Sequence, residues 1–116
     1  MMKRVISVNS KDILTNNFRP IIKIGIPYYK IYQALGEPIS INRANSSVTT
    51  YWKGVLDDGS VFSIYDWDRD LEYVHNPEEN LFWCMASEDP KVIKDVLRLF
   101  DMYNLVKVFD DRFLEG

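Results

Sequence analysis

Apolar residues repeat with the spacing of a helix in two parts of the chain. In the first part they fall at i, i+3, i+4 and i+7, and the chain then reaches Gly36, which suits a left-handed cap. In the second part Asp89 can cap the helix start, Pro90 suits its first position, and an apolar stripe follows. The pattern therefore predicts helices over residues 27–35 and 90–103.

A β-hairpin over residues 48–67 is the strongest signal in the sequence. Two runs rich in β-branched and aromatic residues flank an Asp-Asp-Gly turn, and Asp-Gly favours tight hairpin turns because glycine accepts a positive φ. With Asp58 and Gly59 as the two central turn residues, Trp52 lies opposite Tyr65 and shares its face of the sheet. A three-residue turn would shift this register by one position.

Shorter runs complete the expected sheet. A continuous apolar run at 81–86 has the length of a central strand, and weaker β-like runs occur at 4–8, 20–25 and 105–109. We expect a single α+β domain over residues 1–116, with two layers: an antiparallel sheet centred on the hairpin, and two helices packed mainly on one face. Large apolar groups on the other face would then need a cover.

Composition and charge narrow the classes of function. The 116 residues are 47% hydrophobic and 27% charged, which is typical of one globular domain. Seventeen acidic against 14 basic residues give a net charge of −3, so duplex nucleic acid is a poor partner. The sequence lacks the apolar stretch of a secretion signal or a membrane span, and Cys84 is the only cysteine, so we expect a cytoplasmic protein.

An acidic connection at 66–80 contains the best candidate for metal chemistry. Asp66, Asp68 and Asp70 alternate as in the first half of a calcium-binding loop. The glycine and glutamate that complete such a loop are missing, which favours a solvated acidic loop without a metal. The alternative is a metal-dependent hydrolase built on these aspartates and His75, the only histidine.

Nucleophilic catalysis has weaker support. Cys84 and His75 are separated by one connection and could pair, but Cys84 lies in an apolar run where a buried thiol behaves as a small hydrophobe. The sequence has neither a Gly-x-Ser-x-Gly elbow nor a phosphate-binding glycine loop. We therefore expect a protein that is not an enzyme, with no catalytic residue and no cofactor.

Large aromatic residues are the favoured binding groups. Trp52, Tyr65 and Trp67 share one face in the expected register, Trp83 lies on the adjoining strand, and Arg69 follows closely. Such side chains dominate binding surfaces and stack on flat ligands. A hairpin in a small domain often places its tryptophans in the core, and core packing is the stronger interpretation of these residues. The binding hypothesis requires at least two of the four aromatics to be more than about one third exposed.

The same residues form a series that resembles a family. The series consists of Leu35-Gly36-Glu37-Pro38, Trp52, Asp58-Gly59, Ile64-Tyr65-Asp66-Trp67 and Trp83. Its order and spacing resemble a group of small phage and prophage proteins, over about residues 28–100. The resemblance implies a viral accessory protein in the cytoplasm of a bacterial host, acting by stoichiometric binding of a host or defence factor.

Two binding hypotheses follow. In the first, the protein inhibits a host protein through the aromatic residues and the acidic connection at 66–80, whose charge would steer it toward a basic partner. In the second, it sequesters a nucleotide signal, which stacks between aromatics while Lys53, Arg43 or Arg69 neutralises phosphate. A homo-oligomer closed by the aromatic face is compatible with either.

Overall fold

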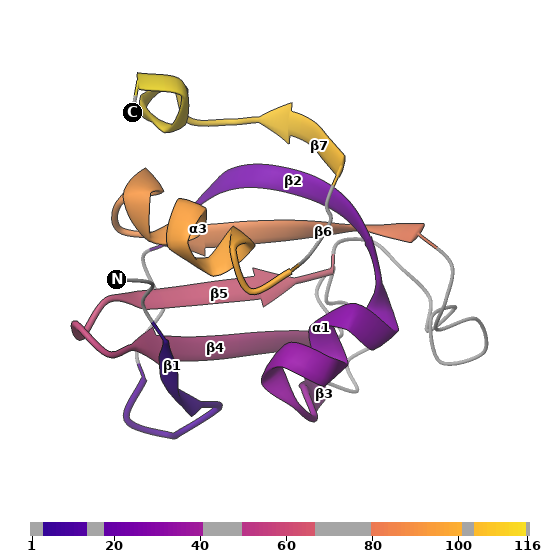
Figure 1. Cartoon of the computed structure of the whole chain (residues 1–116), viewed down its shortest axis with the longest axis vertical. Coiled ribbons are helices and arrows are strands. Elements are labelled where there is room, and N and C mark those ends of the chain that lie inside the picture. Colours follow the sequence, from indigo (N-terminus) through magenta and orange to yellow (C-terminus); the bar gives the residue numbers. More distant parts are fainter. Residues whose placement is uncertain (1–3, 14–17, 41–49, 67–79, 101–103, 116) are drawn as a thin grey trace.

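The computed structural model describes residues 4–13, 18–40, 50–66, 80–100 and 104–115. Within them the chain forms a sheet of seven strands, two α-helices and one 3₁₀-helix (Figure 1). The strands are β1 Val5–Val8, β2 Arg19–Pro27, β3 Ile39–Ser40, β4 Thr50–Leu56, β5 Val61–Tyr65, β6 Asn80–Ser87 and β7 Asn104–Val108. The helices are α1 Tyr28–Leu35, α3 Pro90–Leu97 and the 3₁₀-helix η1 Asp111–Glu115.

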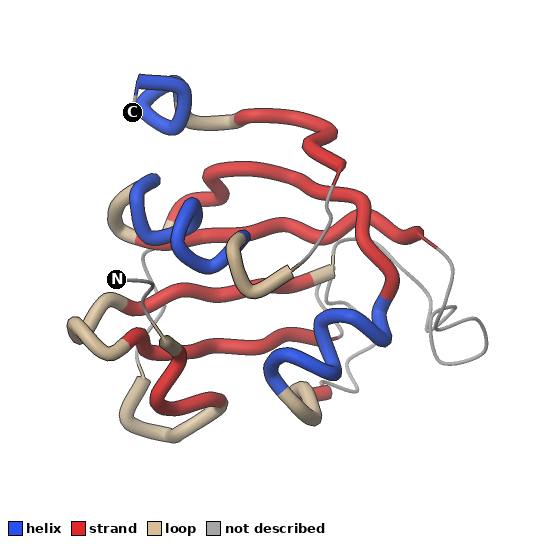
Figure 2. Tube along the Cα trace, in the orientation of Figure 1, coloured by secondary structure: helices blue, strands red, loops and turns tan. Residues whose placement is uncertain are grey.

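All strand pairs are antiparallel, which confirms the expected α+β fold. The strand order is β1-β4-β5-β6-β2-β7, and β3 pairs with the start of β4. Helices α1 and α3 lie over the same face of the sheet (Figure 2), and residues from both helices join one hydrophobic core with the strands. We call this face the inner face and the opposite one the outer face. None of the described helices has the length and apolar content needed to cross a membrane.

Helix α1 is bounded as its sequence indicates. Pro27 precedes it in an extended conformation, and Gly36 follows with φ of 81°. The N–H of Gly36 donates to the carbonyl of Tyr32 at 2.7 Å, which ends the helix in the left-handed conformation that glycine tolerates. The predicted helix over 27–35 is therefore confirmed to within one residue.

Helix α3 is shorter than the predicted span of 90–103. The Asp89 carboxylate accepts the N–H of Lys91 at 3.0 Å and Pro90 occupies the first turn, as expected of a capped start. The helix ends at Leu97, but i+3 hydrogen bonds continue the turn to Phe100. This tighter continuation keeps Phe100 buried, which explains why the apolar stripe extends beyond the helix.

The hairpin register differs from the prediction by one position. Trp52 lies opposite Ile64, and Tyr51 rather than Trp52 lies opposite Tyr65. The physical reason is the turn: Leu56 N–H donates to the carbonyl of Ser60 at 2.8 Å, so residues 57–59 form a three-residue loop, with Gly59 at φ of 88°. The shift turns Trp52 to the same face as Ile64.

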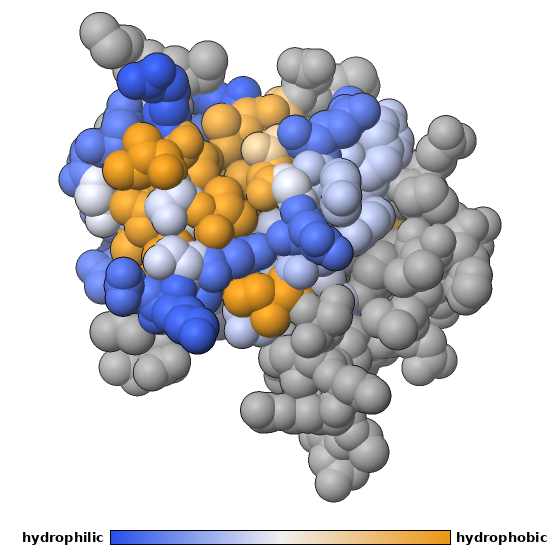
Figure 3. Space-filling model, turned by 90° about the horizontal axis from the view of Figure 1, so that it is seen from below, coloured by the Kyte–Doolittle hydropathy of each residue, from blue (hydrophilic) through white to orange (hydrophobic). Residues whose placement is uncertain are grey.

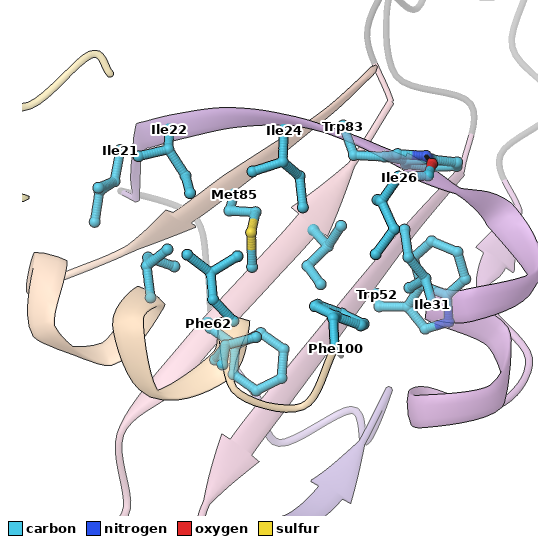
Figure 4. Close-up of a cluster of buried hydrophobic side chains, with 14 of the residues drawn as sticks. Ile21, Ile22, Ile24, Ile26, Ile31, Trp52, Phe62, Trp83, Met85 and Phe100 are labelled. Atoms are coloured by element: carbon cyan, nitrogen blue, oxygen red, sulfur yellow. Dashed lines mark hydrogen bonds between the residues drawn. The ribbon is translucent and has the colours of Figure 1, made fainter. Parts of the chain in front are cut away.

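The core lies between the inner face and the helices (Figure 4). Phe62 and Met85 are fully buried there, next to an isoleucine row from β2. Gly54 lies opposite Phe62, and a Cβ atom at Gly54 would be 2.7 Å from Cε1 of the Phe62 ring. The ring therefore occupies the space above a strand position that has no side chain. The fully buried large side chains are Trp52, Trp83, Phe62, Ile21, Ile22, Ile24, Ile26, Ile31, Leu56, Ile64 and Met85.

Candidate binding surface

Two of the proposed binding aromatics belong to the core. Trp52 and Trp83 are fully buried, and their rings meet edge to face with centroids 5.4 Å apart. Tyr28 of α1 packs against both rings, at 5.8 and 6.2 Å. Core packing, the stronger of the two interpretations of the sequence, is therefore confirmed for these tryptophans, whose side chains lie on the inner face. The requirement for two exposed aromatics could then be met only by Tyr65 and Trp67 together.

Tyr65 is the one proposed binding residue that the described structure places on the outer face. It is half-buried, between Tyr51 of β4 and Cys84 of β6. Burial raises the pKa of the Tyr65 phenol to about 12, and the charge of a Cys84 thiolate would add to the shift. The phenol is therefore neutral at physiological pH. Trp67 and Arg69 lie outside the described residues.

One of the candidate metal ligands, Asp66, is buried rather than solvated. Asp66 is fully buried at the end of the hairpin, where its carboxylate accepts the N–H of Thr50 at 3.0 Å. Its own N–H donates to the carbonyl of Thr50 at 3.1 Å, which extends the β4–β5 ladder by one position. Among the residues with described positions, no group of three potential ligands occurs. Asp68, Asp70 and His75 lie outside the described ranges.

Of the basic residues proposed to bind phosphate, the structure describes Lys53. The Lys53 ammonium donates to the carbonyl of Ile13 at 3.0 Å, so Lys53 fixes the β1–β2 connection against β4. Arg43 and most of the acidic connection at 66–80 lie outside the described residues. Cys84 is buried and forms no disulfide, as expected of a small hydrophobe.

A row of residues crosses five strands on the outer face. Its members are paired neighbours on successive strands, so their side chains share this face. In the order β4, β5, β6, β2, β7 they are Tyr51, Tyr65, Cys84, Lys23 and Lys107. The row ends with two lysines side by side at the β7 edge, and it contains no carboxylate.

Each of these lysines lies over a phenylalanine ring. The Lys23 ammonium is 5.3 Å from the centroid of the Phe82 ring, and the Lys107 ammonium is 5.1 Å from that of Phe109. Phe82, Val106 and Phe109 are 46%, 47% and 41% exposed. We call these five residues, Lys23, Phe82, Val106, Lys107 and Phe109, the lysine–phenylalanine strip.

Gly25 lies beneath the apolar part of the strip. It lies opposite Phe82, and a Cβ atom there would be 3.6 Å from the Phe82 ring and 3.7 Å from Cγ2 of Val106. Both apolar side chains therefore border the one position of β2 that offers no side chain on the outer face. The result is an exposed apolar area beside two positive charges.

The charges of the strip are unbalanced. Lys23 and Lys107 lie directly opposite each other, an arrangement that destabilises a sheet because like charges repel. Neither lysine makes an ion pair in the part of the chain that the structure describes. By contrast, Arg112 is held by Asp110 at 2.8 Å, and this contact lowers the pKa of the Asp110 carboxyl.

Comparison with known proteins gives no relative. Searches with protein-family models, curated proteins and solved structures find no match to this chain. The resemblance to small phage proteins therefore stays an expectation.

The two ends of the sheet differ as binding edges. At the β1 end, Ile6 is 62% exposed and a patch of apolar side chains is visible from that side (Figure 3). Both end strands are short and irregular: the register of β1 shifts between Val5 and Ser7, and that of β7 shifts between Leu105 and Lys107. At the other end, β7 pairs only with β2 among the described strands. Because β7 also adjoins the unbalanced lysines, it is the better candidate.

The strip was not predicted from the sequence, although one part of it has a sequence pattern. Lys107 and Phe109 occur in alternation within the predicted strand at 105–109, which places them on one face. Lys23 and Phe82 come from distant segments. Only the pairing of β2 with both β6 and β7 brings them together.

Proposed function

We propose that the protein is a non-enzymatic binding protein that recognises a negatively charged partner through the lysine–phenylalanine strip. The observation that supports this most is the juxtaposition of Lys23 and Lys107 with no ion pair in the described residues. A like-charge pair costs folding free energy, and a partner that brings carboxylates or phosphates would remove that cost.

The apolar part of the strip supports a macromolecular partner. Phe82, Val106 and Phe109 are all exposed by more than two fifths, and exposed apolar groups next to charges are typical of interaction surfaces. The resemblance to small phage and prophage proteins adds the expectation that the partner is a bacterial host factor, which the protein would inhibit by occupying it.

A nucleotide ligand is the second candidate. An aromatic ring beside an ammonium group can stack a base and neutralise its phosphate, and the strip contains two such pairs. In this structure, however, the lysines lie over the ring faces that a base would use. A nucleotide would have to displace them, so a protein partner is favoured.

Charge reversal tests the proposed function. Wild-type protein, Lys107→Glu and Lys91→Glu are immobilised and exposed to bacterial lysate, and retained proteins are compared. Lys91 is an exposed lysine in the first turn of α3, which packs on the inner face, and it serves as the matched control. We expect a protein retained by wild type and Lys91→Glu and lost with Lys107→Glu. Equal retention by all three would refute the strip as the binding site.

The nucleotide candidate is tested in parallel. Cyclic nucleotides are added to the same three proteins and the melting temperature is measured. A rise with wild type and Lys91→Glu that Lys107→Glu lacks would favour the nucleotide function over the protein-binding function.

A further inference from the structure

The outer edge of β7, which pairs with no other described strand, indicates the form of the partner. Resting on the proposed function, we infer that an extended acidic segment of the partner protein adds to the sheet as an antiparallel strand beside β7. Edge strands bind such segments through main-chain hydrogen bonds, and side chains then select the sequence.

The backbone direction of β7 follows from one hydrogen bond. Phe109 N–H donates to the carbonyl of Ile21 in β2 at 2.8 Å. Neighbouring residues of an antiparallel strand turn their N–H and C=O groups to opposite sides. The N–H and C=O of Val108 therefore point away from β2, toward the edge that none of the described strands occupies, where an added strand can pair with them.

The side chains around Val108 determine which residues of an added strand would be complementary. Lys107 and Phe109 face outward, since the Lys107 ammonium lies over the Phe109 ring, whereas Val108 packs against the core on the inner side. In an antiparallel added strand, the residue opposite Lys107 faces outward and meets its ammonium group. A carboxylate is the complementary side chain at that position.

Apolar residues suit the two preceding positions of the added strand. They lie opposite Phe109, which is exposed on the outer side, and opposite Val108, which borders the core. The expected recognition sequence therefore reads apolar, apolar, acidic in the direction of the added chain. Leu105 is also exposed, at the other end of β7, and extends the apolar contact on the inner side.

The charge pattern of β7 favours an acidic segment of another protein over a second copy of this chain as the added strand. The described part of β7 contains a lysine and no acidic residue, so a second β7 brings no carboxylate to Lys107. A peptide with the expected sequence supplies one. We therefore expect the added strand to be an acidic segment of another protein.

Amide exchange measured by NMR tests the pairing. The probe is a short capped peptide, Ser-Thr-Val-Val-Glu-Val-Thr-Ser, and its control replaces the glutamate with lysine. We expect the first peptide to slow exchange of the Val108 amide, while the Phe109 amide, which is already bonded to β2, changes little. Protection of Val108 by neither peptide would overturn the inference.

A charge swap tests the pairing of Lys107 with the peptide carboxylate. The readout is a preference between two peptides, which a loss of folding alone would not reverse. Lys107→Glu is expected to bind the glutamate peptide about tenfold more weakly and to prefer the lysine peptide, because the cross-strand charge pair changes sign. Lys91→Glu should bind as wild type does. An unchanged preference in Lys107→Glu would contradict the inference, as would concentration-dependent protection of Val108 without peptide, which would indicate pairing of two copies.

The inference and the proposed function fail in different ways. A lysate protein whose retention depends on Lys107, with no peptide effect at Val108, would overturn strand addition and leave the strip as a binding site. Retention that is independent of Lys107 would refute the proposed function itself.

Discussion

The indole rings of Trp52 and Trp83 meet edge to face, and their N–H groups fix the two ends of α1. Trp52 Nε1 donates to the carbonyl of Gly36 just after the helix, at 2.9 Å, and Trp83 Nε1 donates to that of Ile26 just before it, at 3.2 Å. The two buried tryptophans are therefore the structural link between the sheet and α1.

This relationship predicts energetic coupling between the two rings. Trp52→Phe and Trp83→Phe each remove one indole donor from a buried carbonyl, and each should lower the free energy of unfolding by about 1–3 kcal/mol. The double variant should lose less than the sum, by about 0.5–1.5 kcal/mol, because either single substitution already weakens the edge-to-face contact between the two indoles. Urea denaturation of the four proteins measures this, and strict additivity would contradict a direct contact.

Gly54 predicts a specific packing defect. Gly54→Ala would place a methyl group against the buried Phe62 ring, which has little room to shift, and should lower the free energy of unfolding by about 1–3 kcal/mol. Gly25→Ala is the matched control, since its Cβ would meet Phe82 at an ordinary 3.6 Å, and we expect a change below about 1 kcal/mol. Equal losses in the two variants would contradict the close approach at Gly54.

Local patterns were enough to predict most elements, but not how they pair. The spacing of Tyr28, Ile31 and Leu35 indicated α1, and Asp89-Pro90 indicated the start of α3. Whether the hairpin loop contains two or three residues depends on the bond between Leu56 and Ser60, which composition does not determine. That single position decided that Ile64 and Phe62, rather than Tyr65, share the face of Trp52.

The binding surface was harder to predict, because it is formed by strands that are far apart in the sequence. The sequence favoured large aromatics as binding groups, yet burying a tryptophan removes more apolar surface from water than burying a smaller residue, so the core retains Trp52 and Trp83. The smaller Phe82 and the lysines remain outside. Lys23 meets Lys107 only because β2 is followed in the sheet by the last strand.

Tyr65 predicts a dependence of stability on pH in alkaline solution. Its pKa is about 12 in the folded protein and 10.0 in the reference state, so the folded form holds the phenol proton more tightly. The unfolded chain loses this proton first as the pH rises, and the phenol contribution to stability is therefore lost between pH 10 and about 12. Tyr65→Phe should lose stability less steeply in this range. Parallel curves for the two proteins would contradict the shift.

The lysine pair predicts that opposite charges stabilise the free protein. Lys107→Glu and Lys107→Gln both lose the contact with Phe109, so their difference isolates the charge facing Lys23. Lys107→Glu should be the more stable of the two by about 0.2–1 kcal/mol, and the difference should shrink at about 1 M salt. Thermal unfolding at low and high salt measures this. A more stable Lys107→Gln would show that Lys23 is not the neighbour of position 107.

Metal addition separates binding from hydrolase chemistry. We expect no divalent ion to bind the acidic connection that begins at Asp66. Calcium, magnesium and manganese should therefore each leave the melting temperature unchanged. A rise with one of them, abolished by Asp68→Asn together with Asp70→Asn, would favour the metal-dependent hydrolase.

Photo-crosslinking tests the central claim most directly. A photoreactive phenylalanine derivative replaces Val106, in the middle of the lysine–phenylalanine strip, or Leu114, which is 69% exposed on η1 and lies outside the strip. In bacterial lysate, position 106 should give a discrete crosslinked product that Lys107→Glu abolishes, whereas position 114 should give none. Equal crosslinking from the two positions, or a product from position 106 that persists in Lys107→Glu, would contradict recognition through the strip.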